Sequence, residues 1–434
     1  MRRRSSLRYM LFVLLSCTIA VVLTSCSTTN RLESLRNEYK HDVVDVAKYM
    51  EDRKIPSYGS TLPKYYNTGA EWNVRSLELI EKATDYILVS TFLGVEHEST
   101  APVWQALAKK AAEGVRVYIM IDSSSNFQMI PISNERIKAA FMYLRDLGLD
   151  VVEYNSLSMS NLFFLPNLLD RDHRKYWVFD GELLAVGGIN VNQTSIDWPS
   201  GMGNIDTMAE IISPGATEAV LETFVDTWNR YSPQRLHTDD FVVNNELPTG
   251  ESNTALWFLD HNWPSRSSIS SLFDLFSMYA EDELWLVQGY TFLTPALLDR
   301  LRYAVERGVS VNVILSANST QPKYEMASRY GVLDLLDIGV NVWMFESPMK
   351  AFLHLKLMIA DDTLVTVGSA NYNLRSQTLS REMNILFEDH RVAEYSMAYV
   401  DTLLEHCRPV TRKEALSYRN FRSWFNYVLM QVWG

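Results

Sequence analysis

One eight-residue stretch decides the fold of this chain, and it occurs twice: HRKYWVFD at residues 173–180 and HLKLMIAD at residues 354–361. In each copy a histidine and a lysine stand two positions apart, so on a β-strand both side chains point to one face. The apolar residues that follow predict a buried strand. The aspartate and a later Gly-x-x-Asn, GGIN at 187–190 and GSAN at 368–371, then mark a hairpin. The internal spacing of histidine, lysine, aspartate and asparagine is identical in the two copies.

The segments before each copy correspond to one another as well. A helix closed by glycine and followed by an apolar strand is expected at 106–121 and again at 298–315, and a second such pattern at 144–154 and 335–345. Glycine just past a helix end is a typical stop signal. Helix–strand alternation predicts crossover units on sheets covered by helices. We therefore predict an α/β fold in which two similar mixed-sheet α/β domains pack by pseudo-twofold symmetry, with the active site at their interface.

Composition limits the class of protein. A chain of 434 residues with 47% hydrophobic residues is long enough for two or three domains and too apolar to be disordered. Three cysteines are too few for a disulfide scaffold or a Cys-rich zinc module. The net charge of −12 disfavours a protein that binds nucleic-acid backbones, because that affinity comes mostly from Lys and Arg.

The N-terminal residues predict export. Arginines at positions 2, 3, 4 and 8 precede an apolar stretch at 10–23, which is short for a membrane span but typical of a signal peptide. The sequence LTSC at 23–26 resembles a bacterial lipobox, which would make Cys26 the lipidated residue. The alternative is an ordinary uncleaved anchor. Both predict attachment to a membrane of the cell envelope, facing the periplasm or the exterior.

Six parts are expected along the chain. They are a signal peptide at 1–25, a lipid-anchored tether with a helical segment at 26–70, a first domain at 71–235, a linker at 236–254, a second domain at 255–410 and a C-terminal helix at 411–434. Beyond Val43 the tether has an alternative, which is packing on the first domain. The C-terminal helix either docks on the second domain or contacts the membrane interface.

The duplicated residues predict phosphoryl chemistry. Two half-sites that face each other supply two imidazoles, two ammonium groups and two asparagine amides. The lysines and asparagines can donate to the oxygens of one phosphoryl group, while one imidazole attacks phosphorus and the other protonates the leaving oxygen. This chemistry needs no cofactor, and we expect no metal.

The duplicated HxKxxxxD element resembles the signature of the phospholipase D superfamily, and the segments DHRK at 172–175, VGGIN at 186–190 and VGSAN at 367–371 are most similar to bacterial cardiolipin synthases. The resemblance implies that His173 is the nucleophile and His354 the general acid. It implies that Lys175, Lys356, Asn190 and Asn371 hold the phosphoryl oxygens. Asp206 follows His173 along the chain and Glu382 follows His354, and both resemble the acidic partners that orient the imidazoles. Residues expected to support the motifs without touching substrate are Asp180, Asp361, Gly188 and Ser369.

The implied function is cleavage of a phospholipid phosphodiester through a phosphohistidine, with transfer of the phosphatidyl group to an alcohol or to water. Headgroup and acceptor remain open, and the chain is expected to be a monomer. The alternative is a phosphodiesterase of the same superfamily that acts on nucleic acid. An apolar loop at 156–172 leads into the first histidine and is expected to meet either acyl chains or the domain interface.

Overall fold

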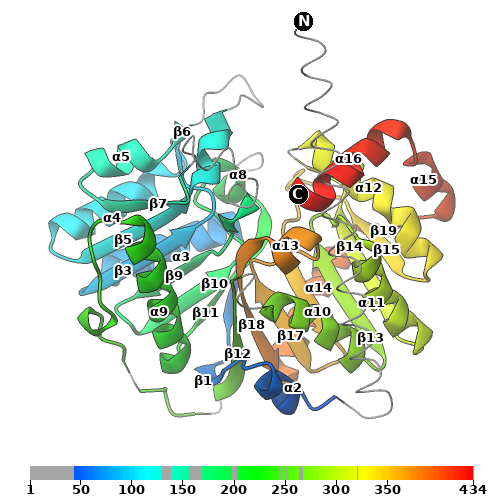
Figure 1. Cartoon of the computed structure of the whole chain (residues 1–434), viewed down its shortest axis with the longest axis horizontal. Coiled ribbons are helices and arrows are strands. Elements are labelled where there is room, and N and C mark those ends of the chain that lie inside the picture. Colours follow the sequence, from blue (N-terminus) through cyan, green and yellow to red (C-terminus); the bar gives the residue numbers. More distant parts are fainter. Residues whose placement is uncertain are drawn as a thin grey trace, which may run out of the picture.

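The computed structural model describes residues 44–129, 138–156, 169–197, 203–244, 246–250, 253–262, 267–319 and 321–433. Two large mixed sheets dominate, each covered by helices and packed against the other near the middle of the molecule (Figure 1). The predicted α/β fold class is confirmed.

The first sheet is formed mostly by the first half of the chain. Its strand order is β2 (Lys64–Thr68), β11 (Ile205–Ile211), β10 (Leu183–Gly187), β9 (Tyr176–Phe179), β3 (Tyr86–Thr91), β5 (Arg116–Asp122) and β7 (Asp150–Tyr154). The helices of this half are α3 (Gly69–Lys82), α4 (Ala101–Ala112), α5 (Phe141–Asp146), α8 (Gln193–Ile196) and α9 (Pro214–Tyr231). Two short strands, β4 (Val95–Glu96) and β6 (Lys138–Ala139), pair separately.

The second sheet repeats this arrangement. Its order is β1 (Ser57–Thr61), β12 (Asn253–His261), β18 (Ser380–Glu388), β17 (Leu364–Gly368), β16 (Lys356–Ala360), β13 (Glu283–Gln288), β14 (Ser310–Ser316), β15 (Asn341–Phe345) and β19 (Cys407–Pro409), with β8 (Arg171–Asp172) paired to β18. The helices are α2 (Val46–Asp52), α10 (Ser268–Tyr279), α11 (Pro295–Glu306), α12 (Pro322–Asp337), α13 (Leu374–Thr378), α14 (His390–Leu404), α15 (Arg412–Ser417) and α16 (Phe421–Trp433).

The motif hairpins have the same register in both sheets. Tyr176 pairs with Val186 between β9 and β10, and Leu357 pairs with Val367 between β16 and β17, so the two pairs occupy equivalent positions of the repeat. The inner strands β10 and β11 pack against β17 and β18, and one hydrophobic core runs through both sheets. The two copies of the motif are thereby brought to one seam.

The glycines predicted to stop the crossover helices do so. Gly114, Gly148, Gly308 and Gly339 all have φ between +77° and +99°, a conformation that favours glycine. Each lies just before the next strand of its sheet, which reproduces the helix–glycine–strand pattern of the sequence.

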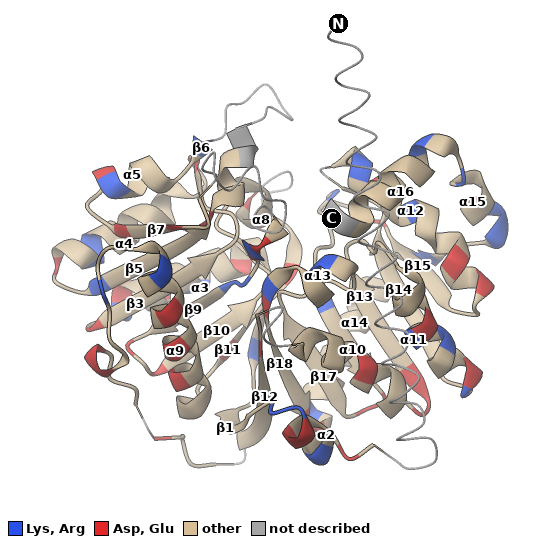
Figure 2. Cartoon of the chain, viewed as in Figure 1, with Lys and Arg blue, Asp and Glu red and all other residues tan. Residues whose placement is uncertain are grey.

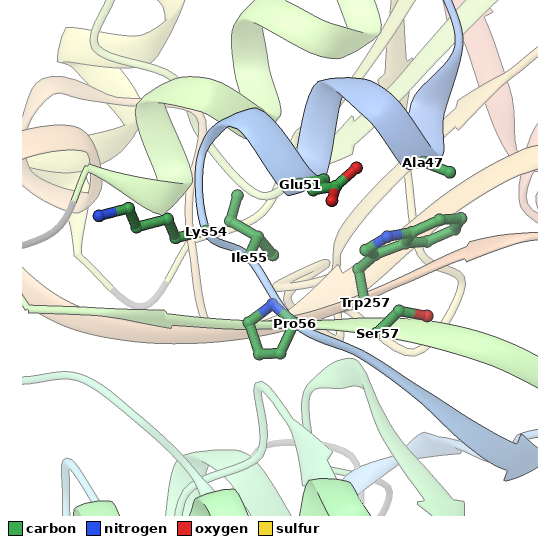
Figure 3. A pocket seen from close by; sticks show the side chains of 7 residues that line it. All are labelled: Ala47, Glu51, Lys54, Ile55, Pro56, Ser57 and Trp257. Atoms are coloured by element: carbon green, nitrogen blue, oxygen red, sulfur yellow. The ribbon is translucent and has the colours of Figure 1, made fainter.

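Residues 44–68 differ from the predicted tether. One face of α2 buries Val46, Tyr49 and Met50 in the core of the second half, β1 joins the second sheet, and β2 joins the first. A pocket lined by Ala47, Glu51, Lys54, Ile55, Pro56, Ser57 and Trp257 lies where α2 and β1 meet β12 (Figure 3). The charged residues of α2 make this segment look solvated in sequence, but they occupy only its outer face.

Several predictions fall outside the described residues. They are the signal peptide and Cys26, which belong to 1–43, and most of the apolar loop, since 157–168 is not described. Within the part of the chain that is described, no helix has both the length and the apolar character that a bilayer span requires.

Candidate active site

Each motif histidine is fixed to the backbone of the opposite half of the chain. The strand β8, just before His173, pairs in parallel with the start of β18, and the His173 N–H donates to the carbonyl of Arg381 at 2.9 Å. Equivalently, Leu353 bridges in parallel to Ile205, and the His354 N–H donates to the carbonyl of Ile205 at 2.8 Å. In both cases the acceptor residue directly precedes an acidic side chain.

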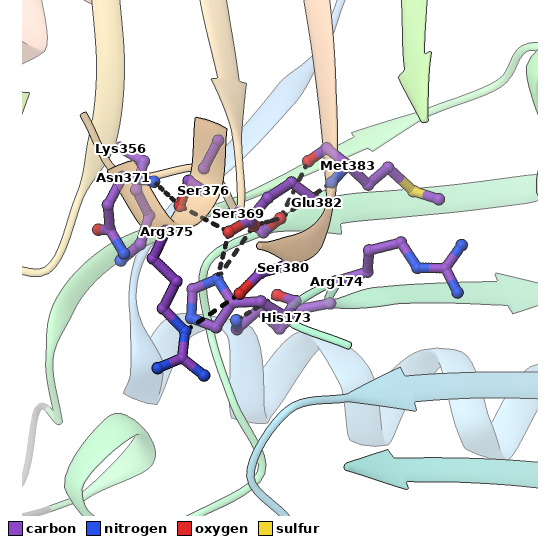
Figure 4. A network of polar contacts seen from close by, with 12 residues as sticks. His173, Arg174, Lys356, Ser369, Asn371, Arg375, Ser376, Ser380, Glu382 and Met383 are labelled. Atoms are coloured by element: carbon purple, nitrogen blue, oxygen red, sulfur yellow. Dashed lines mark hydrogen bonds and ion pairs between the residues drawn. The ribbon is translucent and has the colours of Figure 1, made fainter. Parts of the chain in front are cut away.

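Those acidic side chains bind the histidines across the seam. Nδ1 of His173 lies 3.0 Å from Oε2 of Glu382 (Figure 4), and Nδ1 of His354 lies 2.7 Å from Oδ2 of Asp206. Because an ionised carboxylate only accepts hydrogen bonds, each Nδ1 must carry the proton, which leaves the lone pair on Nε2. The two acids are the predicted ones, and each contacts the histidine of the other half of the chain. The strands β11 and β18 each deliver their carboxylate across the interface.

The two motif lysines lie inside the same site. Nζ of Lys175 donates to the carbonyl oxygen of His173, Nζ of Lys356 donates to that of His354, and Lys356 also lies 3.4 Å from Asp206. The positive charge of Lys175 lowers the pKa of His354, and that of Lys356 lowers the pKa of His173, so each lysine lies close to the histidine of the other motif. The structure therefore brings both His–Lys pairs into one electrostatic cluster.

Burial dominates the protonation of these groups. Desolvation lowers the pKa of His173 and His354 to about 4, more than the neighbouring carboxylates raise it. Desolvation also lowers the pKa of Lys175 to about 7 and that of Lys356 to about 8. For Glu382 and Asp206 burial acts to raise the pKa, but the adjacent histidines and lysines outweigh it and hold the pKa below the ordinary value. At neutral pH the site thus contains neutral imidazoles, ionised carboxylates and lysines close to their titration points.

A cavity opens onto His173. Its lining residues are Phe92, His173, Tyr290, Tyr324, Asn371, Arg375, Ser376, Ser380 and Glu382. The predicted phosphate ligand Asn371 is among them. Its counterpart Asn190 is also buried but does not line this cavity, and its side-chain oxygen accepts from the N–H of Leu93 at 3.1 Å, which leaves its NH2 group as the donor to a ligand.

The two half-sites are not identical. Oγ of Ser369 donates to Glu382 at 2.5 Å, and Oγ of Ser376 donates to it at 2.6 Å. At the equivalent of Ser369 stands Gly188, where an added Cβ would lie 2.2 Å from a carboxylate oxygen of Asp206. Asp206 therefore occupies space that only a glycine at position 188 leaves open. Glu382, which is longer, accepts hydrogen bonds from two hydroxyl groups.

Asp180 and Asp361 lie at the far ends of the motif strands. Asp180 accepts from the N–H groups of Thr84, Asp85 and Tyr86 at 2.8–2.9 Å. Asp361 accepts from the three N–H groups at 281–283. Both aspartates accept hydrogen bonds from the backbone of the turn before the neighbouring strand, and neither lines the cavity. This is the supporting position expected of them.

Six of the nine residues that line the cavity were not predicted as site residues: Phe92, Tyr290, Tyr324, Arg375, Ser376 and Ser380. Ser376 had a usable signal, because Ser195 occupies the equivalent position of the first copy and both serines follow a helix-capping asparagine. Tyr324 lies on α12 and has no counterpart in a motif. It reaches the site only because α12 packs beside it.

The comparisons with known proteins agree with this geometry. The family model described as "Cardiolipin synthase, PLD-like domain" matches residues 76–228 and 278–404, which is more than half of the chain. The chain belongs to this family. Cardiolipin synthase A of Pseudomonas putida is 27% identical over 344 residues, 77% of this chain and 67% of that protein. A cardiolipin synthase of Staphylococcus aureus is 26% identical over 388 residues, 86% of this chain and 75% of that protein.

A solved structure shares the fold of this phospholipase D-like chain. Phosphatidylserine synthase of Haemophilus influenzae superimposes with a TM-score of 0.66 at 13% identity, covering 87% of this chain and 94% of that one. The predicted enzyme class, a phosphodiesterase or transphosphatidylase of the phospholipase D superfamily, is confirmed by the family and its relatives.

Proposed function

We propose that this family member is an exported, lipid-anchored phosphatidyltransferase that cleaves a glycerophospholipid and passes the phosphatidyl group to an alcohol, as a cardiolipin synthase does. The observation that carries the proposal is the pair of crossed His–carboxylate contacts beside two buried lysines. In the proposed complex, the two Nε2 atoms and the two lysine cations act on a single phosphodiester. The names of the relatives supply the class of substrate.

The first half-reaction needs a neutral His173 and a His354 that gains a proton on Nε2 when substrate binds. Nε2 of His173 attacks phosphorus, and the bond from phosphorus to the headgroup oxygen breaks. His354 donates the proton that the leaving alcohol needs. A bound phosphodiester anion next to Asp206 favours protonation of His354, because negative charge close to an imidazole raises its pKa. Lys175, Lys356, Asn190 and Asn371 are the donors proposed for the phosphoryl oxygens.

The second half-reaction reverses the roles. An acceptor alcohol loses its proton to Nε2 of His354, its oxygen attacks the phosphohistidine, and the bond to His173 breaks. Water can replace the alcohol, and exclusion of water from the site then decides the balance between transfer and hydrolysis. The aromatic side chains of Phe92, Tyr290 and Tyr324 around the cavity favour transfer, since they limit the water that can accompany a lipid headgroup.

Nucleic acid is the less favoured substrate. Arg174, the residue between the motif His and Lys, is fully buried and paired with Asp172 and Asp260. Arg171 is also buried, 3.5 Å from Asp122. Neither guanidinium can line a groove for a nucleic-acid backbone.

The test is incubation of the purified full chain with phosphatidylglycerol labelled in its glycerol and acyl groups. We expect labelled cardiolipin together with free glycerol, and less phosphatidic acid than cardiolipin. The His173→Ala variant should form none of these products. Cleavage of single-stranded DNA without any lipid turnover would overturn the proposal.

The proposed location is the surface of a membrane in the cell envelope, reached through lipidated Cys26. Metabolic labelling with a radioactive fatty acid in a bacterial host should mark the wild-type chain and not Cys26→Ser. Label that persists in the variant would remove the support for the anchor.

A further inference from the structure

The end of the chain presents apolar side chains to solvent. Large exposed apolar residues cluster between positions 416 and 424 at the junction of α15 and α16: Leu416 is 53% exposed, Phe421 77% and Trp424 41%. The rings of Phe421 and Trp424 contact each other with centroids 5.6 Å apart. A cluster of this kind on the surface of a protein marks an interaction site rather than scattered exposure.

The helix α16 also buries its polar side chains. Ser423, Asn426 and Gln431 are buried, and Gln431 and Tyr427 each donate to the carbonyl of Leu293 at 2.6 Å. The inner face of α16 also carries the buried apolar side chains of Tyr427 and Met430. Here α16 is fixed to α12 and to the 293 backbone while Phe421 and Trp424 point outward.

Basic residues flank the exposed rings. Between 412 and 424 stand Arg412, Lys413, Arg419 and Arg422 against one acid, Glu414, a local charge of +3 in a chain whose net charge is −12. Figure 2 shows these Lys and Arg residues on α15 and along the turn into α16. Arg412 and Arg419 also pair with acids of α12, so Lys413 and Arg422 are the cations expected to meet lipid. Aromatic residues interleaved with cations favour the interface of an anionic bilayer, where rings lie at headgroup depth and cations meet lipid phosphates.

This helix adjoins the wall of the active site. Tyr427 and Met430 on its inner face form a small core with Phe292, against which Tyr290 and Tyr324 of the cavity pack. The helix α16 also packs on α13, which carries Arg375 and Ser376 of the cavity. The helix that carries the exposed rings is therefore packed against side chains that line the cavity next to His173.

We propose that α15 and α16 form an interfacial docking element, which seats Phe421 and Trp424 in the headgroup region of an anionic phospholipid bilayer and brings the active-site cavity to the lipid. This contact is separate from the N-terminal anchor, which would tether the chain without orienting the site. The contact requires no step of the proposed reaction, and cross-linking detects it without turnover.

The contact is measured by photocross-linking of the full chain on vesicles of phosphatidylglycerol and phosphatidylcholine. The variant Trp424→p-benzoylphenylalanine should cross-link to acyl lipid upon irradiation. The matched control carries the same probe at Tyr395 on α14, which is 52% exposed, and should give at least fivefold less lipid adduct. Phosphatidylcholine alone should reduce the adduct at position 424 severalfold. Cross-links to another part of this chain, to a second copy, or to nothing would overturn the proposal.

Turnover measurements with a bilayer substrate and a soluble substrate separate membrane docking from catalysis. The double variant Phe421→Ser and Trp424→Ser should lower turnover of bilayer phosphatidylglycerol at least tenfold and change turnover of a soluble short-chain analogue less than twofold. Arg422→Glu, which leaves both rings in place, should lower only the turnover on anionic vesicles. Equal loss on both substrates by both variants would contradict docking. Absence of wild-type turnover on both substrates would instead refute the proposed function and leave the cross-linking result standing.

Discussion

Oδ2 of Asp206 lies 2.7 Å from Nδ1 of His354, although the two residues come from different halves of the chain. The same exchange joins Glu382 to His173. Each motif imidazole therefore acquires its orientation only when the halves are assembled, and a half-site alone would present a histidine without its carboxylate.

The crossed pairs predict which variant disturbs which histidine. Asp206→Asn should alter the tautomer of His354, and Glu382→Gln that of His173, each with a loss of activity of about 10²–10⁴-fold, as for other histidines that lose an orienting carboxylate. Nitrogen NMR of the histidine side chains checks this directly. If Asp206→Asn shifts the signals of His173 and leaves those of His354, the crossed arrangement does not exist in solution.

The histidines should differ in their dependence on the leaving group. His173→Ala should abolish turnover and the acid-labile phosphoenzyme, because no other Nε2 is proposed to attack. His354→Ala should slow formation of the intermediate strongly for phosphatidylglycerol but much less for phosphatidyl-p-nitrophenol, whose leaving group needs no proton. Rapid-quench measurements with both substrates distinguish the roles. A phosphoenzyme that still forms in His173→Ala would show that His173 is not the nucleophile and would point to His354 instead.

Activity should decline at alkaline pH. Lysine is charged below its pKa, and burial lowers the pKa of Lys175 to about 7 and that of Lys356 to about 8. We therefore expect kcat/KM to fall as the pH rises through 7–8. The bound phosphodiester raises the pKa of both lysines, so kcat should fall at a higher pH. Profiles between pH 5 and 10 test this, and a kcat/KM that continues to rise at pH 9 would refute it.

Gly188 should tolerate no side chain. Gly188→Ala places a Cβ within 2.2 Å of the Asp206 carboxylate, so the carboxylate must leave Nδ1 of His354, and we expect a loss of activity of at least about 100-fold. The matched change Ser369→Ala removes a single hydroxyl donor to Glu382 and should cost about tenfold or less. Steady-state kinetics at equal folded fraction, checked by circular dichroism, compare the two. Equal effects would show that the two half-sites are more alike than their contacts indicate.

The motif aspartates should matter for stability more than for chemistry. Asp180→Ala leaves the backbone N–H groups of Thr84, Asp85 and Tyr86 without their acceptor, which should lower the free energy of unfolding by about 1–3 kcal/mol. Asp361→Ala should act alike in the second half. Urea unfolding measures the loss, while kcat at low temperature should stay within about threefold. A variant of normal stability with no activity would place the aspartate in the chemistry instead.

The sequence predicts the local parts of the site well. The spacing of His173 and Lys175, the hairpin that follows and the stop glycines such as Gly114 all depend on contacts within a few residues. The structure confirms the two hairpins and the positive φ of the stop glycines. The family resemblance added the identity of both acids. Beyond Val43 the sequence left open a tether or packing on the first domain, and residues 44–68 pack on both halves. The sequence could not predict this because the buried face of α2 is short and β12, the strand that pairs with β1, comes from the second half of the chain.

What the sequence determined by itself is the chemical content of two equal half-sites, because duplication, strand alternation and turn residues are local properties. Only the tertiary structure decided which of the two carboxylates contacts which of the two histidines. Asp206 and Glu382 follow their own histidines by similar distances, and the sequence contains nothing that distinguishes pairing within a half from exchange across the seam. The packing of β10 and β11 against β17 and β18 makes that choice, since it places the end of each acid-bearing strand beside the histidine of the other sheet.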